Sequence, residues 1–236
     1  MAPQIVYEDS DIIVINKPSG LITHQKDIND TQPSVVDWVI ENYPTLKDIG
    51  EPFMASGQPV ARAGIVHRLD KDTSGLLLVA KSNDAFFYLK DLFQTRKIHK
   101  YYLALVHGRT KEPSGTISSA MGRIGMKRTT QLTGKKLIDE KKAETEYKTV
   151  KNFTDYTLLE LMPKTGRTHQ LRVHLNSIGH PIAGDPLYGF KKLSPPPGLK
   201  RLFLHAYKLE LTTPQGKALA LETDLPEELS TVLHDL

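Results

Sequence analysis

Two short segments gather the side chains best suited to chemistry. The first segment, residues 67–72, places five ionisable side chains between two apolar runs: His67, Arg68, Asp70, Lys71 and Asp72. Charged groups held against a hydrophobic core need partners, and catalytic groups with perturbed pKa values occur in such places. The alternative is a plain polar turn, because Thr73, Ser74 and Gly75 follow and are ordinary turn formers. On residue types alone, both interpretations stay open.

The second segment, Pro163-Lys-Thr-Gly-Arg-Thr-His-Gln-Leu-Arg-Val-His174, joins basic residues to an expected helix over residues 168–177. Thr168 is a plausible N-cap, so backbone N–H groups and Arg167 would meet at the helix start and form an anion site. Arg172 lies one turn further along, where a guanidinium is able to hold a carboxylate through two hydrogen bonds. Gly179 stands just beyond the helix, where a left-handed cap favours glycine.

No metal or nucleotide cofactor is expected. His169 and His174 are five residues apart, so they do not share a helix face as a four-residue spacing would allow, and neither has an acidic neighbour suited to zinc. The sequence contains no GxxxxGK phosphate loop and no GxGxxG turn. With no cysteine in the chain, thiolate metal sites, disulfides and cysteine nucleophiles are excluded.

A third candidate lies on an expected strand over residues 98–108. Side chains alternate along a strand, so Lys100 and Tyr102 share one face and Tyr101 points to the other. At most one of the two tyrosines is therefore able to enter a given pocket. Two further phrases, Gly184-Asp-Pro-Leu-Tyr-Gly189 and Leu202-Phe-Leu-His-Ala206, read as a tight turn and a buried strand.

The charge is unevenly distributed along the chain. Between Arg96 and Lys136 ten Lys or Arg residues stand against one acid, Glu112, which gives this basic stretch a net charge of +9 within a total of +4. A one-sided basic region on a nearly neutral protein is typical of proteins that bind polyanions such as RNA. The alternative is that these side chains are merely solvated loop residues.

The elements that must position these groups follow from local signals. A hairpin is expected around Asp9-Ser10, helices capped by Ser34 and Ser82, and a closing helix with Pro226 at its first position. Residues 109–142 show little periodicity. Strands outnumber helices, which predicts an α+β fold with a mixed, largely antiparallel sheet flanked by helices and loops. The 236 residues show no signal peptide and no apolar run near membrane-span length, so we expect a cytoplasmic protein.

In order, these motifs resemble those of the RluA-type RNA pseudouridine synthases. HRLDKDTSGLLLVAK is a long and specific match, and IxKxYxAxVxG, PxTGRTHQLRVH, GHPIAGDPLYG and LFLHA follow in the family's order. The resemblance extends from the first hairpin to Asp224-Leu-Pro226. It implies the family's fold with a central catalytic cleft, a single catalytic domain over residues 1–236, and no appended N-terminal RNA-binding domain. It also implies a monomer that binds RNA and needs neither cofactor nor metal.

The resemblance further implies an isomerase that converts uridine to pseudouridine within RNA. Its essential aspartate corresponds to Asp70, which attacks the substrate covalently or takes a proton from the ribose; both routes need an ionised carboxylate. The arginine that pairs with this aspartate corresponds to Arg172, and the active-site tyrosine corresponds to Tyr102. Arg68 corresponds to the side chain that fills the gap left by a flipped base. The further substrate-binding candidates are His67, Thr73, Lys100, Arg167, and the pocket-wall residues Leu171 and Leu204.

The segment around Asp70 is most similar to enzymes of large-subunit ribosomal RNA, and transfer RNA is the alternative substrate. A non-catalytic RNA-binding module is a further alternative, although Asp70, Tyr102 and Arg172 are all present. A hydrolase of N-glycosidic bonds would need two separated carboxylates in distinct environments. Asp70 and Asp72 flank a single lysine, which fits that requirement poorly.

Overall fold

Strands and helices that are far apart in the sequence come together in two units. The structure is a computed structural model and describes residues 2–25, 29–55, 57–125, 127–130, 136–190 and 192–236. Unit 1 consists of Met1–His99 and Ala206–Thr223, and unit 2 consists of Lys100–His205 and Asp224–Leu236. The assignment of residues 1–236 to one catalytic domain stays a prediction.

Unit 1 is built on a sheet that carries the segment around Asp70. Its elements in chain order are β1 (Gln4–Glu8), β2 (Ile12–Lys17), α1 (Val35–Asn42), the 3-10 turn η1 (Pro44–Leu46), β3 (Phe53–Ala55), β4 (Gln58–Val60), β5 (Ser74–Ala80), α2 (Asn83–Gln94), β13 (Leu204–Thr212) and β14 (Ala218–Glu222). The strand order is β1-β2-β5-β13, and β14 pairs with β13. The β1–β2, β2–β5 and β13–β14 pairings are antiparallel. The first two residues of β13 belong to unit 2.

The predicted local signals in unit 1 are confirmed. The β1–β2 hairpin turns around Asp9-Ser10. Ser34 caps α1 in a full capping box, because its hydroxyl accepts from the Asp37 N–H while the Asp37 carboxylate accepts from the Ser34 N–H. Ser82 caps α2 by accepting from the Ala85 N–H. Each of these signals depends on residues three or fewer positions apart, which is why the sequence alone reveals them.

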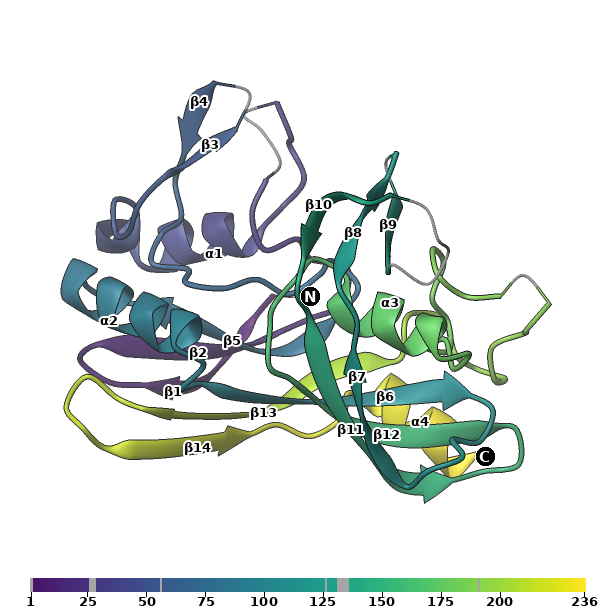
Figure 1. Ribbon diagram of the computed structural model, residues 1–236. Helices are drawn as coiled ribbons and strands as arrows, with labels where there is room; N and C mark the ends of the chain where they lie inside the picture. The colour runs from purple at the N-terminus through teal and green to yellow at the C-terminus, as the bar shows by residue number, and fades with distance from the viewer. Residues whose placement is uncertain (1, 26–28, 56, 126, 131–135, 191) are drawn as a thin grey trace. The chain divides into compact units, whose positions relative to one another are not determined.

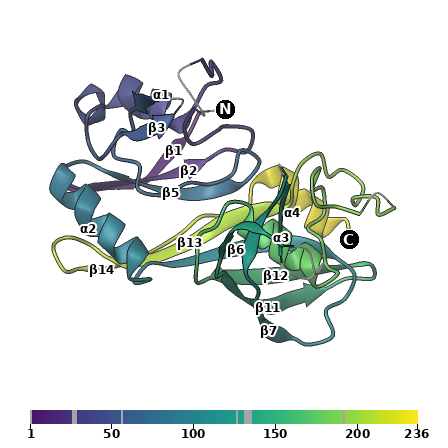
Figure 2. The same ribbon diagram turned by 45° about the horizontal axis from the view of Figure 1, so that its top comes forward.

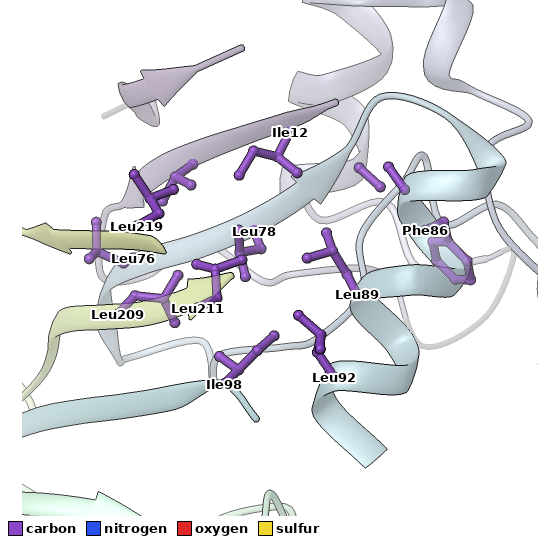
Figure 3. Packing of buried hydrophobic residues seen from close by; sticks show 13 residues of the cluster. Ile12, Leu76, Leu78, Phe86, Leu89, Leu92, Ile98, Leu209, Leu211 and Leu219 are labelled. Atoms are coloured by element: carbon purple, nitrogen blue, oxygen red, sulfur yellow. The ribbon is translucent and has the colours of Figure 1, made fainter. Parts of the chain in front are cut away.

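The core of unit 1 lies between α2 and the sheet. Every residue of β5 is buried, and α2 turns Leu89 and Leu92 toward Leu78 and its neighbours on the sheet, with Phe86 of α2 in the same cluster (Figure 3). This is the face that the 3.6-residue period predicts for α2. Truncating a buried leucine of this kind to alanine typically costs about 2–5 kcal/mol of stability. The strand that follows Asp70 is therefore a rigid base.

Unit 2 contains a larger group of antiparallel strands, a small sheet and two helices. Its elements are β6 (His99–His107, of which His99 belongs to unit 1), β7 (Ser114–Ser118), β8 (Met121–Ile124), β9 (Lys127–Thr130), β10 (Ile138–Lys141), β11 (Glu144–Asn152), β12 (Tyr156–Pro163), α3 (Gln170–Ser177) and α4 (Glu227–His234). The larger group has the order β6-β12-β11-β7, and β10-β8-β9 form the small sheet (Figure 1). Helix α3 contacts β9 and β12, and Figure 2 shows it beside β12.

Two expectations in unit 2 need correction, and a segment for which the sequence predicted no elements contains strands. Residues 109–142 contain the short strands β7 to β10, although their sequence shows little periodicity; β10, for example, is exposed at all four positions. The N-cap of α3 is His169 in the left-handed conformation (φ +59°), not Thr168, so α3 begins at Gln170. Pro226 is the N-cap of α4 rather than its first residue, because its ψ of 141° is extended.

The α+β class with largely antiparallel pairing is confirmed. Gly179 follows α3 with a φ of +86°, as expected for a left-handed position after a helix. The central cleft stays a prediction. None of the helices in the described ranges is both long and apolar enough to span a membrane.

Candidate active site

The segment that carries Asp70 is fixed at both ends by glycines. Gly64 has a φ of +75°, and a Cβ there would lie 2.1 Å from the Ala80 carbonyl oxygen. Gly75 has a φ of +120°, and a Cβ there would lie 2.2 Å from the Ala206 carbonyl oxygen. No other residue type fits either position without moving backbone. The segment between them, residues 64–75, is therefore held against β5 at one end and against β13 at the other.

Asp70 opens a tight turn at the centre of this segment. The Thr73 N–H donates to the Asp70 carbonyl oxygen at 3.1 Å, which places Lys71 and Asp72 in the middle of the turn. Thr73 is 2% exposed and directly precedes β5, while Asp70 is half-buried. This geometry makes Asp72 a turn residue. The two carboxylates thus occupy different positions of one turn.

The segment from the end of β2 onward, residues 17–23, forms hydrogen bonds to the backbone of this turn. Lys17 is fully buried, and its ammonium group donates to the carbonyl oxygens of Pro18 (2.8 Å), Leu21 (2.7 Å) and Lys71 (3.1 Å). The Gly20 N–H also donates to the Lys71 carbonyl oxygen, at 2.8 Å. A buried ammonium surrounded by three carbonyl oxygens is electrostatically satisfied. It therefore fixes the middle of the turn from within the unit.

Two hydroxyl groups of the same segment also form hydrogen bonds to the backbone of the turn. The Thr23 hydroxyl donates to the Leu69 carbonyl oxygen at 2.8 Å and accepts from the Leu69 N–H at 3.2 Å. The Ser19 hydroxyl donates to the Asp72 carbonyl oxygen at 2.9 Å. Residues 17–23 thus bind backbone groups on both sides of Asp70. These residues carry no local sequence signal, since their partners lie about fifty positions away.

The two residues before Leu69, His67 and Arg68, make separate contacts. His67 accepts a hydrogen bond on Nε2 from the Leu78 N–H at 2.9 Å, and its ring lies 4.7 Å from that of Phe93. This is a bond to the backbone of β5, and the assignment of His67 to substrate binding stays a prediction. Arg68 is exposed, and its Nη1 lies 3.2 Å from Nε2 of His24. An arginine only donates, so this contact requires His24 to accept on Nε2.

His24 is held neutral by its surroundings. Burial, followed by the nearby charges of Arg68 and Arg62, lowers the pKa of His24 to about 4. The neutral ring accepts the Arg68 hydrogen bond, whereas a charged ring would repel that guanidinium. The neutral state of His24 therefore keeps Arg68 in place beside the turn.

In unit 2, β6 presents Lys100 and Tyr102 from one face, as predicted. Tyr102 is 8% exposed and pairs with Leu161 of β12, while its neighbour Tyr101 is half-buried. The Lys100 ammonium lies 3.7 Å from the place a Cβ on Gly166 would occupy. Burial lowers the pKa of Lys100 to about 8. At pH 7 a lysine with this pKa is still mostly charged, and an approaching anion stabilises that charge.

Gln170 organises the approach to α3 and was missed from the sequence. Its side-chain oxygen accepts from the Thr165 hydroxyl (2.7 Å) and from the Arg167 N–H (3.0 Å). Its side-chain nitrogen donates to the Glu144 carbonyl oxygen (2.9 Å) and to the Thr145 hydroxyl (3.0 Å). Because Gln170 takes up the Arg167 N–H, this backbone donor does not contribute to the predicted anion site. The Arg167 side chain is exposed, and its Nε donates to the Lys142 carbonyl oxygen at 3.3 Å.

Arg172 is buried in unit 2 and forms a two-bond ion pair with Asp185. Its Nε and Nη2 donate to the two carboxylate oxygens of Asp185, each at 2.7 Å. The predicted pairing of Arg172 with Asp70 stays a prediction, because these residues belong to different units. Asp185 was read from the sequence as part of a tight turn. Its position within GHPIAGDPLYG, a phrase shared with the family, was the one signal that pointed to it.

The remaining site predictions divide between the units. Unit 1 holds Asp70 with His67, Arg68 and Thr73; unit 2 holds Tyr102 and Arg172 with Lys100, Arg167, Leu171 and Leu204. Leu171 and Leu204 are 7% and 3% exposed, as apolar wall residues would be. Within the ranges that the structure describes, no three His, Asp or Glu side chains are grouped so that they could hold a metal ion.

Part of the basic stretch is occupied by contacts within the protein. Arg123 forms an ion pair with Asp139, and the Arg109 side chain donates to the Phe153 carbonyl oxygen at 3.0 Å. Lys136 is exposed and Arg128 is half-buried. Lys135 and the side chain of Lys127 lie outside the described residues. The small sheet β10-β8-β9 carries several of these basic residues.

Comparison with known proteins gives a consistent result. A family model described as RNA pseudouridylate synthase matches residues 11–177. "Ribosomal large subunit pseudouridine synthase D" of Nitrosomonas europaea is 41% identical over 98% of this chain, and an "Uncharacterized RNA pseudouridine synthase" of Chloroflexus aurantiacus is 42% identical over 94% of it. The chain spans 64% and 65% of the lengths of these two relatives.

Solved structures agree in fold. The human protein "RNA Pseudouridylate Synthase Domain Containing 4" superposes with a TM-score of 0.75 at 27% identity, covering 98% of this chain and 91% of that one. The human protein "RNA Pseudouridylate Synthase Domain Containing 1" gives a TM-score of 0.74 at 26% identity, covering 98% and 87%.

Proposed function

The chain belongs to the RNA pseudouridylate synthase family, and on this premise we propose that it is an isomerase that converts uridine to pseudouridine within RNA. One observation carries the proposal: the family match over residues 11–177 contains Asp70, Tyr102 and Arg172 together. In this reaction the bond between uracil and ribose breaks, the base turns, and a carbon–carbon bond forms to the same sugar. Atoms are conserved, so no co-reactant is required.

The proposed substrate is large-subunit ribosomal RNA. Relatives from Nitrosomonas europaea, Borreliella burgdorferi and Haemophilus influenzae, at 38–41% identity, carry the name ribosomal large subunit pseudouridine synthase D, which supports this choice. Transfer RNA is the second candidate, and the experiment below separates the two. The proposal includes action in the cytoplasm as a monomer, as expected from the sequence.

Asp70 is the proposed catalytic residue. Its carboxylate attacks the substrate or removes a proton from the ribose, and in both cases it must stand ionised beside the sugar. The hydrogen bonds from residues 17–23 to the backbone of Leu69, Lys71 and Asp72 support this role, because they fix the turn that carries the carboxylate. A fixed carboxylate loses little entropy when the sugar arrives.

Arg172 and Tyr102 are the proposed partners of Asp70. The Arg172 guanidinium stabilises the ionised carboxylate and aims it at the sugar. The Tyr102 ring stacks on the uracil, and its hydroxyl moves a proton late in the reaction. Leu171 and Leu204 wall the base pocket; both are buried and apolar.

Base flipping is the proposed route by which the uridine reaches Asp70. A uridine within a stem is out of reach, and extruding it costs a few kcal/mol. Arg68 is exposed and is held by neutral His24, so its planar guanidinium is available to stack in the gap that the base leaves. The further substrate-binding residues are His67, Thr73, Lys100 and Arg167, and the basic stretch follows the phosphate backbone.

Tritium release tests the proposal directly. RNA labelled at carbon 5 of uracil loses this hydrogen when pseudouridine forms, so ribosomal and transfer RNA transcripts are incubated separately with the protein and with Asp70→Asn. Release by the wild type alone supports the isomerase, and the transcript that responds identifies the substrate class. Binding without release from either transcript, or from ribosomal subunits assembled without the modification, would favour a non-catalytic RNA-binding module. Release of free uracil would indicate a hydrolase.

A further inference from the structure

Asp185 holds Arg172 in one orientation through the most completely buried ion pair described in unit 2. The Arg172 side chain is 3% exposed, and that of Asp185 is fully buried. Asp185 Oδ2 accepts from Nε and Oδ1 accepts from Nη2, both at 2.7 Å. Two parallel bonds to a planar fork fix direction as well as distance. The guanidinium therefore has no freedom to rotate about its axis while this pair is intact.

The carboxylate of Asp185 is itself fixed by its own turn. Its Oδ1 also accepts from the N–H groups of Leu187 (2.8 Å) and Tyr188 (3.0 Å), and the Gly189 N–H donates to the Asp185 carbonyl oxygen (3.2 Å). Burial alone would raise the pKa of Asp185, but the Arg172 guanidinium and the two backbone N–H groups outweigh it, so the pKa lies below its usual value. Asp185 is thus an acceptor of fixed position whose ionised form is favoured.

Tyr188 restrains the guanidinium from a second side. The Arg172 guanidinium carbon lies 5.1 Å from the centre of the Tyr188 ring, a cation–π distance. The Tyr188 hydroxyl lies 2.9 Å from Nδ1 of His169, the left-handed N-cap of α3. Residues 185–189 therefore contact both the edge and the face of the Arg172 guanidinium. Tyr188 also contacts the N-cap of the helix that carries Arg172.

We propose that Asp185 is a positioning residue for the isomerisation: it fixes Arg172 so that the opposite edge of the guanidinium meets the reacting carboxylate. This inference rests on the proposed function, in which Arg172 acts with Asp70. The pair with Asp185 uses Nε and one N–H of Nη2, which are two of the five guanidinium N–H groups. The edge formed by Nη1 is therefore the one whose direction Asp185 determines.

A purely structural role is the rival explanation. Buried ion pairs contribute little net stability, because desolvation offsets most of the attraction, and an apolar pair of similar volume often serves equally well. Stability alone therefore gives weak reason for this pair. A need to keep a charged guanidinium in one orientation is a stronger reason for this ion pair.

The first test replaces Asp185 with the nearly isosteric asparagine. In Asp185→Asn the amide is unable to accept both guanidinium bonds, so we expect kcat for tritium release to fall about 100-fold, as for a misplacement of about 1 Å, while the Kd for RNA changes less than threefold. Glu228→Gln is the matched control, because Glu228 accepts from Arg201 Nε at 3.1 Å in the same unit. It should keep wild-type kcat. An Asp185→Asn enzyme with kcat within threefold of wild type overturns the proposal.

A double-mutant cycle separates positioning from structure. If Asp185 acts through Arg172, then Asp185→Asn lowers kcat no further in an Arg172→Met background. Multiplicative losses in the double variant would show that Asp185 acts by another route and would overturn the proposal. If Arg172→Met alone keeps full kcat, the role proposed for Arg172 fails, and the inference fails with it. If Arg172→Met is impaired and Asp185→Asn is not, the inference alone fails.

A charge-conserving variant covers the case in which Asp185→Asn does not fold. Asp185→Glu keeps the ion pair but moves the carboxylate by one methylene, so we expect a folded protein, by circular dichroism and thermal unfolding, with kcat lowered at least tenfold. Full kcat in this variant would show that the charge is sufficient and that orientation is not required, which contradicts the proposal.

Discussion

Thr23 and Leu69 hold each other through two reciprocal hydrogen bonds, one in which the Thr23 hydroxyl donates to the Leu69 carbonyl and one in which it accepts from the Leu69 N–H. Thr23 is 2% exposed, so no water is able to replace either bond. One hydroxyl group thus satisfies both backbone groups of the residue that precedes Asp70. Its partners would be left unsatisfied in the interior if it were removed, at a cost of about 1–3 kcal/mol.

Thr23→Val should therefore lower both stability and turnover. Valine has nearly the same shape and lacks the hydroxyl, so the Asp70 turn loses one of its anchors, and we expect kcat to fall about tenfold or more with a positional error well under 1 Å. The control is Thr213→Val in the same unit. Thr213 is 1% exposed and accepts from the Lys217 N–H at 3.2 Å in the β13–β14 turn. Equal losses of kcat in the two variants, measured well below their unfolding midpoints, would argue against a specific effect on the turn.

Asp70→Asn should abolish turnover while leaving the fold and RNA binding unchanged. Asparagine keeps the shape of the side chain but is neither a nucleophile nor a base. Asp72→Asn, within the same turn, should retain measurable activity. The hydrogen bond from the Ser19 hydroxyl goes to the backbone carbonyl of residue 72 and does not depend on the side chain. Tritium release and RNA binding by both variants check this. The reverse pattern would transfer the catalytic role to Asp72.

Stability should fall as the pH decreases from about 6.5 toward 5. Burial lowers the pKa values of His24, His107 and His174 in the folded protein, to about 4 for His24. Unfolded histidines have a pKa of about 6.5, so below that pH the unfolded chain binds protons that the folded protein excludes. Urea midpoints at pH 7.5, 6.0 and 5.0 should decrease in that order. His24→Gln should flatten this decrease, and a midpoint that rises toward pH 5 would contradict the assignment.

Charge reversal in the basic stretch should weaken RNA binding in a salt-dependent manner. Arg128→Glu combined with Lys136→Glu should raise the Kd at least tenfold and reduce the slope of log K against log salt by about one for each lost phosphate contact. Lys47→Glu combined with Lys217→Glu makes the same charge change at exposed positions outside the stretch. If both pairs change the Kd and slope equally, only net charge is at work and the stretch is no specific RNA contact.

Local signals made much of the fold predictable. Ser34 and Ser82 reveal their helices because each cap bonds to a backbone N–H three residues away. The strands β7 and β10 were missed because short, largely exposed strands show no regular alternation of buried and polar residues. The left-handed His169 was missed as well, since Thr168 is the better cap by residue type and the backbone path is set by Gln170 bonding to β11.

The candidate site was less predictable, for a related reason. Asp70, Tyr102 and Arg172 were named from phrases shared with a family, and no spacing rule would have found them. Asp185 and Thr23 act on residues that are distant in sequence, Arg172 and Leu69, so their partners are known only once the chain is folded. Asp185 also looks like an ordinary turn former between Gly184 and a proline. Residues that support a site through the backbone leave no local pattern.

The close packing of Gly75 against Ala206 also sets an order of events during protein synthesis. At roughly 5–20 residues per second, a ribosome needs on the order of ten seconds to extend the chain from Gly75 to Ala206. Until β13 has left the exit tunnel, one end of the Asp70 segment lacks the strand against which it is held. A nascent chain therefore lacks one of the two supports of the Asp70 segment. An enzyme proposed to modify ribosomal RNA thus carries an incomplete Asp70 segment on the ribosome until β13 has emerged.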